Sequence, residues 1–229
     1  MPDLLADTLR LTAFTLGVAA AATLWILPPG VALGYALSRR GWRGRSALEA
    51  LVSLPLVLPP TAVGLCLLLV LGRDGLLGGP LHRWLGIDLA FTWKAVVVAS
   101  GVVAFPLLVR SVRSALEEVD PRLLAVARTL GRGPAGTFFA VHLPLAWRGV
   151  VAGTVLAFAR ALGEFGATIL VAGNIPGRTQ TLALAIFQRV QVGRDREALA
   201  LAGVSALLAF SAMLAVEWLT RRRERTLEL

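Results

Sequence analysis

Apolar residues along this chain form long uninterrupted blocks, without the three- to four-residue spacing of an amphipathic surface helix. The blocks lie near residues 11–38, 47–71, 90–110, 145–172 and 198–220. A bilayer core of ~30 Å is crossed by about 20 apolar helical residues, so each block is long enough to span a membrane. The pattern predicts an all-α integral membrane protein with five transmembrane helices, or at most six, in a single domain over residues 1–229.

Prolines fall within several of these blocks. They are Pro28, Pro29, Pro55, Pro59, Pro60 and Pro106. Each removes a backbone donor and kinks or breaks a helix, so we expect an interruption at 28–30 and an end to the third span at Pro106. Transporters often place broken helices along the substrate path. Simple kinking for packing explains the same pattern, so both interpretations stay open here.

The composition supports a membrane protein over a soluble one. Of 229 residues, 56% are hydrophobic and 16% are charged, whereas a soluble domain carries about a quarter charged residues. The net charge of +9 comes almost wholly from arginines, but these lie between apolar blocks, where membrane topology explains them better than nucleic acid does. Cys66 is the only cysteine, which excludes an intrachain disulfide and a cysteine metal cluster.

Arginine clusters orient the chain. They follow the first and third blocks and the last one, at 39–45, 110–132 and 221–225. With five spans these three regions share one side, and the positive-inside rule then places the N-terminus outside and the C-terminus in the cytoplasm. The connection 173–197 weakens this assignment, because it carries four arginines on the opposite side.

Residues 114–144 form the most informative connection. Asp120 followed by Pro121 is a good helix start, and Gly131 is a good end. A second short helical piece is expected to end at Leu143-Pro144, where the fourth span begins. Such a short amphipathic helix can lie on lipid headgroups, pack on its own bundle, or dock a soluble partner.

The spacing within this connection resembles a known family. Gly131 is followed after nine residues by Val-His-Leu-Pro at 141–144, which is similar to the cytoplasmic coupling loop of binding-protein-dependent ABC importers. The family's Glu-Ala-Ala is replaced by Ala-Val-Ala at 125–127, which puts its ionic contact to the ATPase in doubt. Longer stretches resemble molybdate-transport permeases, namely 54–64, 105–120, 127–131, 158–169 and 173–182.

The resemblance implies the permease subunit of an ABC importer that moves molybdate, and also tungstate, by alternating access. It implies a homodimer in the lipid bilayer of the cytoplasmic membrane, with two cytoplasmic ABC ATPase subunits and an extracytoplasmic oxyanion-binding protein. The chain has no GxxxxGK[ST] motif, so ATP and magnesium would bind the partner. We expect no catalytic activity, cofactor, metal or nucleic acid on this chain. The alternatives are a sulfate or thiosulfate permease, an intramembrane enzyme and a non-transporting membrane protein.

Two sets of candidate residues follow. Contacts to the ATPase are expected from Ala125, Ala127, Arg128, Thr129, Leu130, Gly131, Thr137, Phe138 and Phe139. The last three are candidates for a buried anchor because aromatic residues dominate interface energetics. Packing within the chain is the equal alternative for the two phenylalanines.

The translocation pathway or gate is expected to involve Pro59, Pro60, Thr61, Arg160, Glu164, Gly166 and Thr168. Ionisable residues at membrane depth are functional candidates by default. Arg160 and Glu164 are four residues apart on one helical face, so we expect them to pair. Molybdate is a dianion that a bare carboxylate would repel, which favours pairing or gating for Glu164. Gly163 and Gly166 are expected to permit close helix approach.

Overall fold

The structure is a computed structural model that describes residues 2–39 and 41–221. Within these ranges every regular element is a helix, which confirms the all-α prediction. The elements are α1 (Pro2–Ser38), α2 (Arg45–Val57), α3 (Pro60–Leu71), α4 (Gly78–Leu85), α5 (Trp93–Glu117), α6 (Pro121–Thr129), α7 (Pro134–Thr137), the π-helix η1 (Phe138–His142), α8 (Leu143–Leu162), α9 (Gly166–Val171), α10 (Leu182–Gln191) and α11 (Asp195–Arg221). Arg40 and the tail arginines at 222, 223 and 225 lie outside the described residues.

Four stretches of helix are long and apolar enough to cross a membrane. They are Leu5–Ser38, Trp93–Glu117, Pro134–Leu162 and Asp195–Trp218. The pair α2 and α3 passes the same test together but is bent by 109°. Counting this bent pair as one span gives the five predicted helices, and the described residues supply no sixth.

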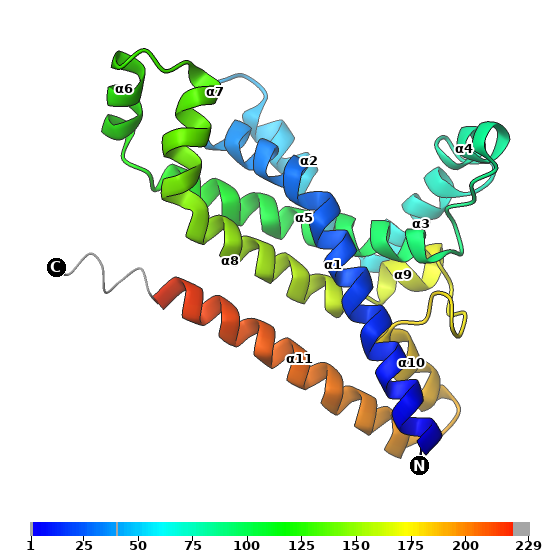
Figure 1. The fold of residues 1–229 in the computed structure, drawn as a ribbon. Helices are drawn as coiled ribbons and strands as arrows, with labels where there is room; N and C mark the ends of the chain where they lie inside the picture. The colour runs from blue at the N-terminus through cyan, green and yellow to red at the C-terminus, as the bar shows by residue number, and fades with distance from the viewer. Residues whose placement is uncertain (1, 40, 222–229) are drawn as a thin grey trace.

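Helix α5 lies at the centre of the bundle and packs on both α1 and α8 (Figure 1). Glycines bring the helices together: a Cβ on Gly34 of α1 would lie 2.6 Å from Val112, and one on Gly149 of α8 would lie 2.4 Å from the Cβ of Ala115. Small residues of this kind let membrane helices approach closely. In contrast, α11 leaves most of its apolar surface exposed, as expected for a helix that faces lipid.

Two expected interruptions are absent. Pro28 and Pro29 lie inside the continuous α1, and Pro106 lies inside α5, which runs on to Glu117. The predicted end of the third span at Pro106 is therefore wrong, and Arg110 belongs to the helix. The helices α1, α5 and α8 pack on one another, and membrane helices tolerate the missing hydrogen bonds where neighbouring helices surround them.

The fourth block is also organised differently from the prediction. The helical piece does not end at Leu143-Pro144, since helix continues from Pro134 to Leu162 through the π-turn η1. In this turn the N–H of Leu143 donates to the carbonyl of Phe138, five residues back. The wider π-turn accommodates Pro144, and the helix continues past it. The block instead breaks at 163–165, before α9.

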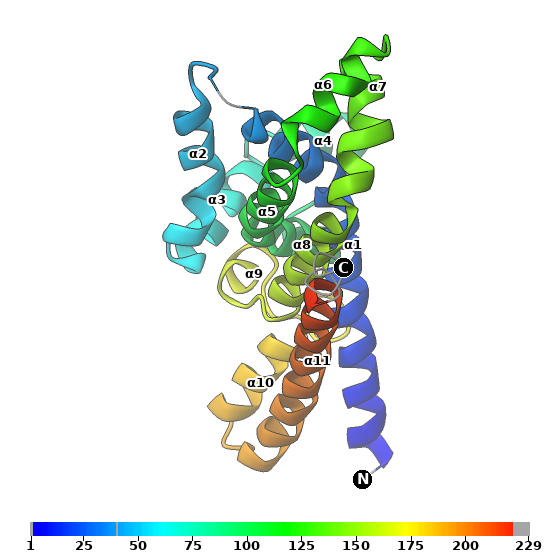
Figure 2. The same ribbon diagram turned by 90° about the vertical axis from the view of Figure 1, so that its left-hand side faces the viewer.

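The elements are sorted to two ends of the molecule. The N-terminus, α10 and the start of α11 lie at one end, and α6 and α7 lie at the other (Figures 1 and 2). At the first end Arg189 pairs with Asp7 at 2.7 Å and with Glu197 at 3.0 Å. This pairing compensates part of the positive charge in the connection 173–197 that weakened the topology assignment.

Candidate functional site

Two broken helices meet in the membrane region. The first break separates α2 from α3 at Leu58–Pro59, and the second separates α8 from α9 at 163–165. The half-helices α3 and α9 pack against each other: a Cβ on Gly166 would lie 2.6 Å from the Cβ of Pro60, and one on Gly64 would lie 2.6 Å from the carbonyl oxygen of Ala167. The structure therefore joins two breaks that are about a hundred residues apart in sequence.

This contact brings several predicted pathway residues together. Pro60, Thr61 and Gly166 lie at the crossing of the two half-helices, and Pro59 caps the start of α3. The expectation of close approach holds for Gly166, whereas a Cβ on Gly163 would have nothing within 4 Å among the described residues. Thr168 is fully buried, and its hydroxyl has no hydrogen-bond partner in the described part of the chain.

Arg160 and Glu164 form the predicted ion pair across the second break. The Nη1 atom of Arg160 lies 3.0 Å from Oε2 of Glu164, whose side chain is 2% exposed. The other carboxylate oxygen accepts a 2.8 Å hydrogen bond from the N–H of Ala167 in the first turn of α9. Both oxygens are thus engaged within the chain, so Glu164 links the end of α8 to the start of α9.

The segment of α6 and α7, which carries the predicted ATPase contacts, lies at the other end of the molecule (Figure 1). Asp120 caps α6 through a 2.8 Å bond from the N–H of Arg122, as predicted, and Gly131 has φ +83°. Most of the candidate contact residues of α6 are exposed, namely Ala125, Arg128, Thr129, Leu130 and Gly131. Ala127 is buried and faces the chain itself.

The three candidate residues after Gly133 divide between interior and surface. Thr137 is buried, and Phe138 packs on Tyr35 of α1 with ring centroids 4.5 Å apart. Only Phe139 is open, with 68% of its surface exposed. The contribution of Tyr35 could not be predicted from sequence, because this residue belongs to a different apolar block and no spacing connects it with Phe138.

Next to this contact His142 is buried, and its Nε2–H donates to the carbonyl of Leu116 at 2.9 Å. This bond and the Tyr35–Phe138 contact tie the α7–η1 segment to the ends of α1 and α5. The segment is therefore in direct contact with two spans.

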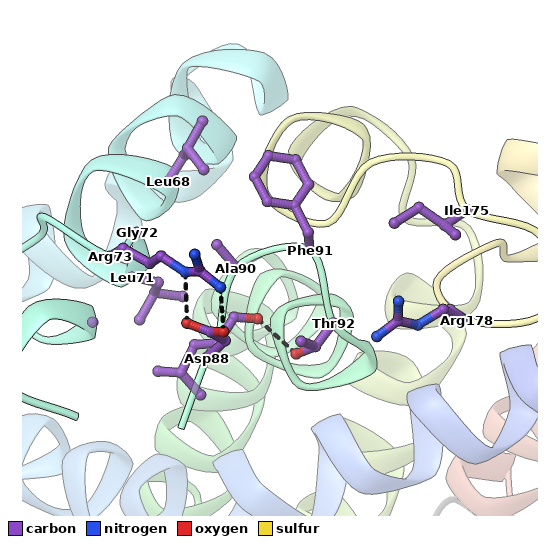
Figure 3. A pocket seen from close by; sticks show the side chains of 12 residues that line it. Leu68, Leu71, Gly72, Arg73, Asp88, Ala90, Phe91, Thr92, Ile175 and Arg178 are labelled. Atoms are coloured by element: carbon purple, nitrogen blue, oxygen red, sulfur yellow. Dashed lines mark hydrogen bonds and ion pairs between the residues drawn. The ribbon is translucent and has the colours of Figure 1, made fainter. Parts of the chain in front are cut away.

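A cavity of about 560 Å³ opens at the end of the molecule away from α6, between the end of α3, the start of α5 and the loop after α9 (Figure 3). Arg73 binds Asp88 through two hydrogen bonds of 3.0 and 2.8 Å, and His82 lies 3.0 Å from the same carboxylate. The Arg73 guanidinium holds the pKa of Asp88 below its usual range. Arg178 lines the opposite wall, is exposed, and has no ion-pair partner in the described part of the chain.

Arg178 was expected from the sequence to face the anion or the binding protein, whereas Arg73 and Asp88 were not among the predicted candidates. Arg73 and Asp88 are opposite charges that flank a glycine-rich connection, which was the only available signal for their pairing. Within the described residues no group of three or more His, Cys, Asp or Glu is placed to hold a metal.

Comparison with known proteins adds to this geometry. Residues 30–225 match the family described as "Binding-protein-dependent transport system inner membrane component". The chain is 46% identical to the Molybdenum transport system permease protein ModB of Escherichia coli K12, over 92% of this chain and 93% of that protein. It is 42% identical to ModB of Haemophilus influenzae over 93% of both chains. It is 33% identical to the probable sulfate transport system permease protein cysT of Zygnema circumcarinatum, over 94% of this chain and 73% of that protein.

Among solved structures, the chain has the fold of a subunit of the inward-facing MetNI methionine ABC transporter. The TM-score is 0.75 at 17% identity, and the match covers 97% of this chain and 98% of that one. The arrangement of helices is therefore shared with a transporter despite a low sequence identity.

Proposed function

The chain belongs to the family of binding-protein-dependent transport system inner membrane components, and from this premise we propose that it is the membrane-spanning permease of an ABC importer for molybdate, with tungstate as a second substrate. The observation that carries the substrate is the 46% identity to a molybdenum permease along nearly the whole chain. Sulfate is the second candidate, favoured by the 33% identity to a probable sulfate permease, and it is the weaker one.

The partners proposed are a second copy of this chain, two cytoplasmic ABC ATPase subunits that bind ATP and magnesium, and an extracytoplasmic oxyanion-binding protein. The N-terminus lies outside and the C-terminus in the cytoplasm. The compact α6–α7 segment at one end and the paired charges of Arg189 at the other support this orientation.

A continuous helix suggests how ATP hydrolysis is coupled to the pathway. The helix over Pro134–Leu162 begins in the docking segment and ends at the Arg160–Glu164 pair. Its 29 residues reach about 43 Å at ~1.5 Å per residue. Closure of the ATPases moves α6 and α7, and this helix carries the movement as a rigid body to the second break.

At that break the substrate dianion meets a neutralised pair instead of a bare carboxylate. Because Glu164 is engaged by Arg160 and by the N–H of Ala167, its charge repels the anion less. The pair joins the end of α8 to the start of α9, so a movement of α8 reaches the half-helix that packs on α3.

The test is ATP-dependent uptake into vesicles that contain this chain, its ATPase and its binding protein. Molybdate uptake that tungstate inhibits strongly and sulfate inhibits weakly is expected. Uptake of sulfate without molybdate would overturn the substrate assignment. Absence of any uptake, with the three proteins assembled, would favour a non-transporting membrane protein or an intramembrane enzyme.

A further inference from the structure

A second cavity, of about 270 Å³, lies beneath the docking segment. The apolar part of its lining includes Leu116, Val119 and Leu124. Two arginines line it from different elements, Arg39 just after α1 and Arg128 in the last turn of α6. The cavity therefore combines apolar lining residues with cations that the chain brings together from positions about ninety residues apart.

The two cations have no compensating charge. Arg39 and Arg128 are exposed, and neither forms an ion pair with any described residue. The one carboxylate in the lining, that of Glu117, is bound by Arg45 at 2.8 Å and by Arg113 at 2.9 Å. The cavity thus has two exposed cations in its lining that no described carboxylate neutralises.

The chemistry of the cavity fits a phosphate group attached to an apolar body. Guanidinium groups bind phosphate oxygens in a bidentate manner, and the apolar part of the lining suits the glycerol and upper acyl carbons of a lipid. The cavity lies where two spans end, at Ser38 of α1 and Glu117 of α5, which is the depth of the headgroups. Cytoplasmic leaflets are anionic, and basic pockets between membrane helices on that side bind anionic headgroups.

We propose that this cavity binds the phosphate group of an anionic phospholipid and that the bound group bridges α1 to α6. The inference rests on the proposed orientation, with α6 in the cytoplasm. Helix α6 packs chiefly on α7 and η1, so a phosphate held by Arg39 and Arg128 adds a contact to α1. The contact fixes the exposed apolar residues of α6, Leu123 and Val126, in position for the ATPase.

The experiment uses the assembled complex of permease and ATPase in detergent. Short-chain phosphatidylglycerol is titrated, and bound lipid is counted by native mass spectrometry while the melting temperature is followed. One saturable site per permease chain is expected. The variant Arg39→Gln/Arg128→Gln should bind about 25-fold more weakly, because each basic residue contributes roughly fivefold near an anionic headgroup.

The matched control is Arg43→Gln/Arg122→Gln, which removes the same charge from the same two segments outside the lining of the cavity. It should keep the parent affinity. The variant Arg39→Lys/Arg128→Lys keeps the charge but loses the bidentate geometry, so intermediate binding supports the proposal even where the glutamine variant does not fold.

Two further titrants show whether the bound phosphate group comes from a lipid or from a soluble phosphate. Phosphatidylcholine should not bind, and inorganic phosphate that binds as tightly as the lipid would assign the site to a soluble phosphate. Unchanged lipid binding in the glutamine variant, an equal loss in the control, or binding that disappears when the ATPase is assembled would overturn the proposal. Lipid binding is measured without substrate or transport. The measured lipid affinity therefore remains interpretable even if the molybdate assignment is wrong.

Discussion

Single residues hold the two broken helices together in different ways. Gly64 and Gly166 allow close packing because they lack a side chain: a Cβ at either position would clash with the opposite half-helix. Glu164 acts by charge and hydrogen bonding, since it binds Arg160 on one side of the break and the backbone of Ala167 on the other. Steric fit therefore stabilises the crossing of α3 and α9, and charge stabilises the neighbouring break between α8 and α9.

Replacing Gly64 with alanine should destabilise the protein by about 1–3 kcal/mol, as overpacking does in a close-packed interior. The new Cβ would lie 2.6 Å from the carbonyl oxygen and 2.8 Å from the Cα of Ala167, and backbone cannot move aside as a side chain can. Thermal unfolding in detergent measures the change. Gly203→Ala in α11 is the control, since nothing lies within 4 Å of its Cβ position among the described residues; equal melting temperatures for the two variants would contradict this account.

Glu164→Gln keeps an acceptor for the N–H of Ala167 but leaves Arg160 without its counter-charge. We expect a loss of about 1–3 kcal/mol in unfolding free energy, because the Arg160 charge loses its counter-ion while its side chain, at 31% exposure, keeps part of its hydration. Substrate uptake should fall together with binding-protein-stimulated ATP hydrolysis. Adding Arg160→Gln should recover part of the stability, and normal uptake and coupled ATPase activity in the single variant would exclude a role for the charge.

At the scale of elements, one continuous helix over Pro134–Leu162 joins the proposed docking segment to the proposed gate at Arg160 and Glu164. The π-turn η1 at its start turns Phe138 toward α1 and leaves Phe139 exposed. Phe138 thus packs inside the chain, whereas the neighbouring Phe139 lies on its surface.

This division predicts opposite effects of two similar substitutions. Phe139→Ala should weaken association with the ATPase and leave the melting temperature of the permease unchanged. Phe138→Ala should lower the melting temperature by the equivalent of about 1–3 kcal/mol, since a partly buried aromatic loses less than the 3–5 kcal/mol of a fully buried one. Copurification and thermal unfolding of both variants provide the measurement. A stability loss in Phe139→Ala equal to that in Phe138→Ala would be inconsistent with the placement.

The connection 72–92, which contains α4, should loosen in acid. Arg73 lowers the pKa of Asp88, so their pairing stabilises the connection fully above the unfolded pKa of about 3.9. The stabilisation is lost as the pH falls through the lowered folded value. Hydrogen exchange of this connection should therefore accelerate, after correction for intrinsic rates, below about pH 4. Asp88→Asn should be fast at every pH, and a parent protein whose protection does not change in acid would refute the pairing.

At the scale of the whole molecule, the docking segment and the Arg178 cavity lie at opposite ends of the bundle. A coupled transporter requires this separation, because the ATPase and the delivery protein act from opposite sides of the membrane. The orientation of the chain in the membrane decides which of the two ends faces the cytoplasm.

The proposed topology predicts the labelling of single cysteines in a Cys66→Ala background. Arg194→Cys, before α11, should react with an impermeant thiol reagent in intact cells. Arg122→Cys, in α6, should react only after the membrane is permeabilised. Both positions are exposed, so a difference in access reports the side of the membrane, and the reverse order would invert the assignment.

The features that could be predicted from sequence are those encoded locally. Apolar blocks indicated the number of spans, Asp120 and Pro121 indicated the start of α6, and the four-residue spacing indicated the Arg160–Glu164 pair. Prolines were less informative: Pro59 and Pro60 mark a real break, whereas Pro28 and Pro106 do not. Pro28 and Pro106 lie inside α1 and α5, which pack against each other, whereas Pro59 and Pro60 lie where α2 ends and α3 begins.

The long apolar blocks by themselves determined that the chain is an all-α membrane protein, because the bilayer demands continuous apolar helices whatever packs beside them. Only the tertiary structure decided that the breaks at Pro59 and Glu164 meet, that Phe138 packs on Tyr35, and that Arg39 and Arg128 share a cavity. These contacts join residues from different blocks, and their geometry depends on how the helices cross, which no local pattern encodes.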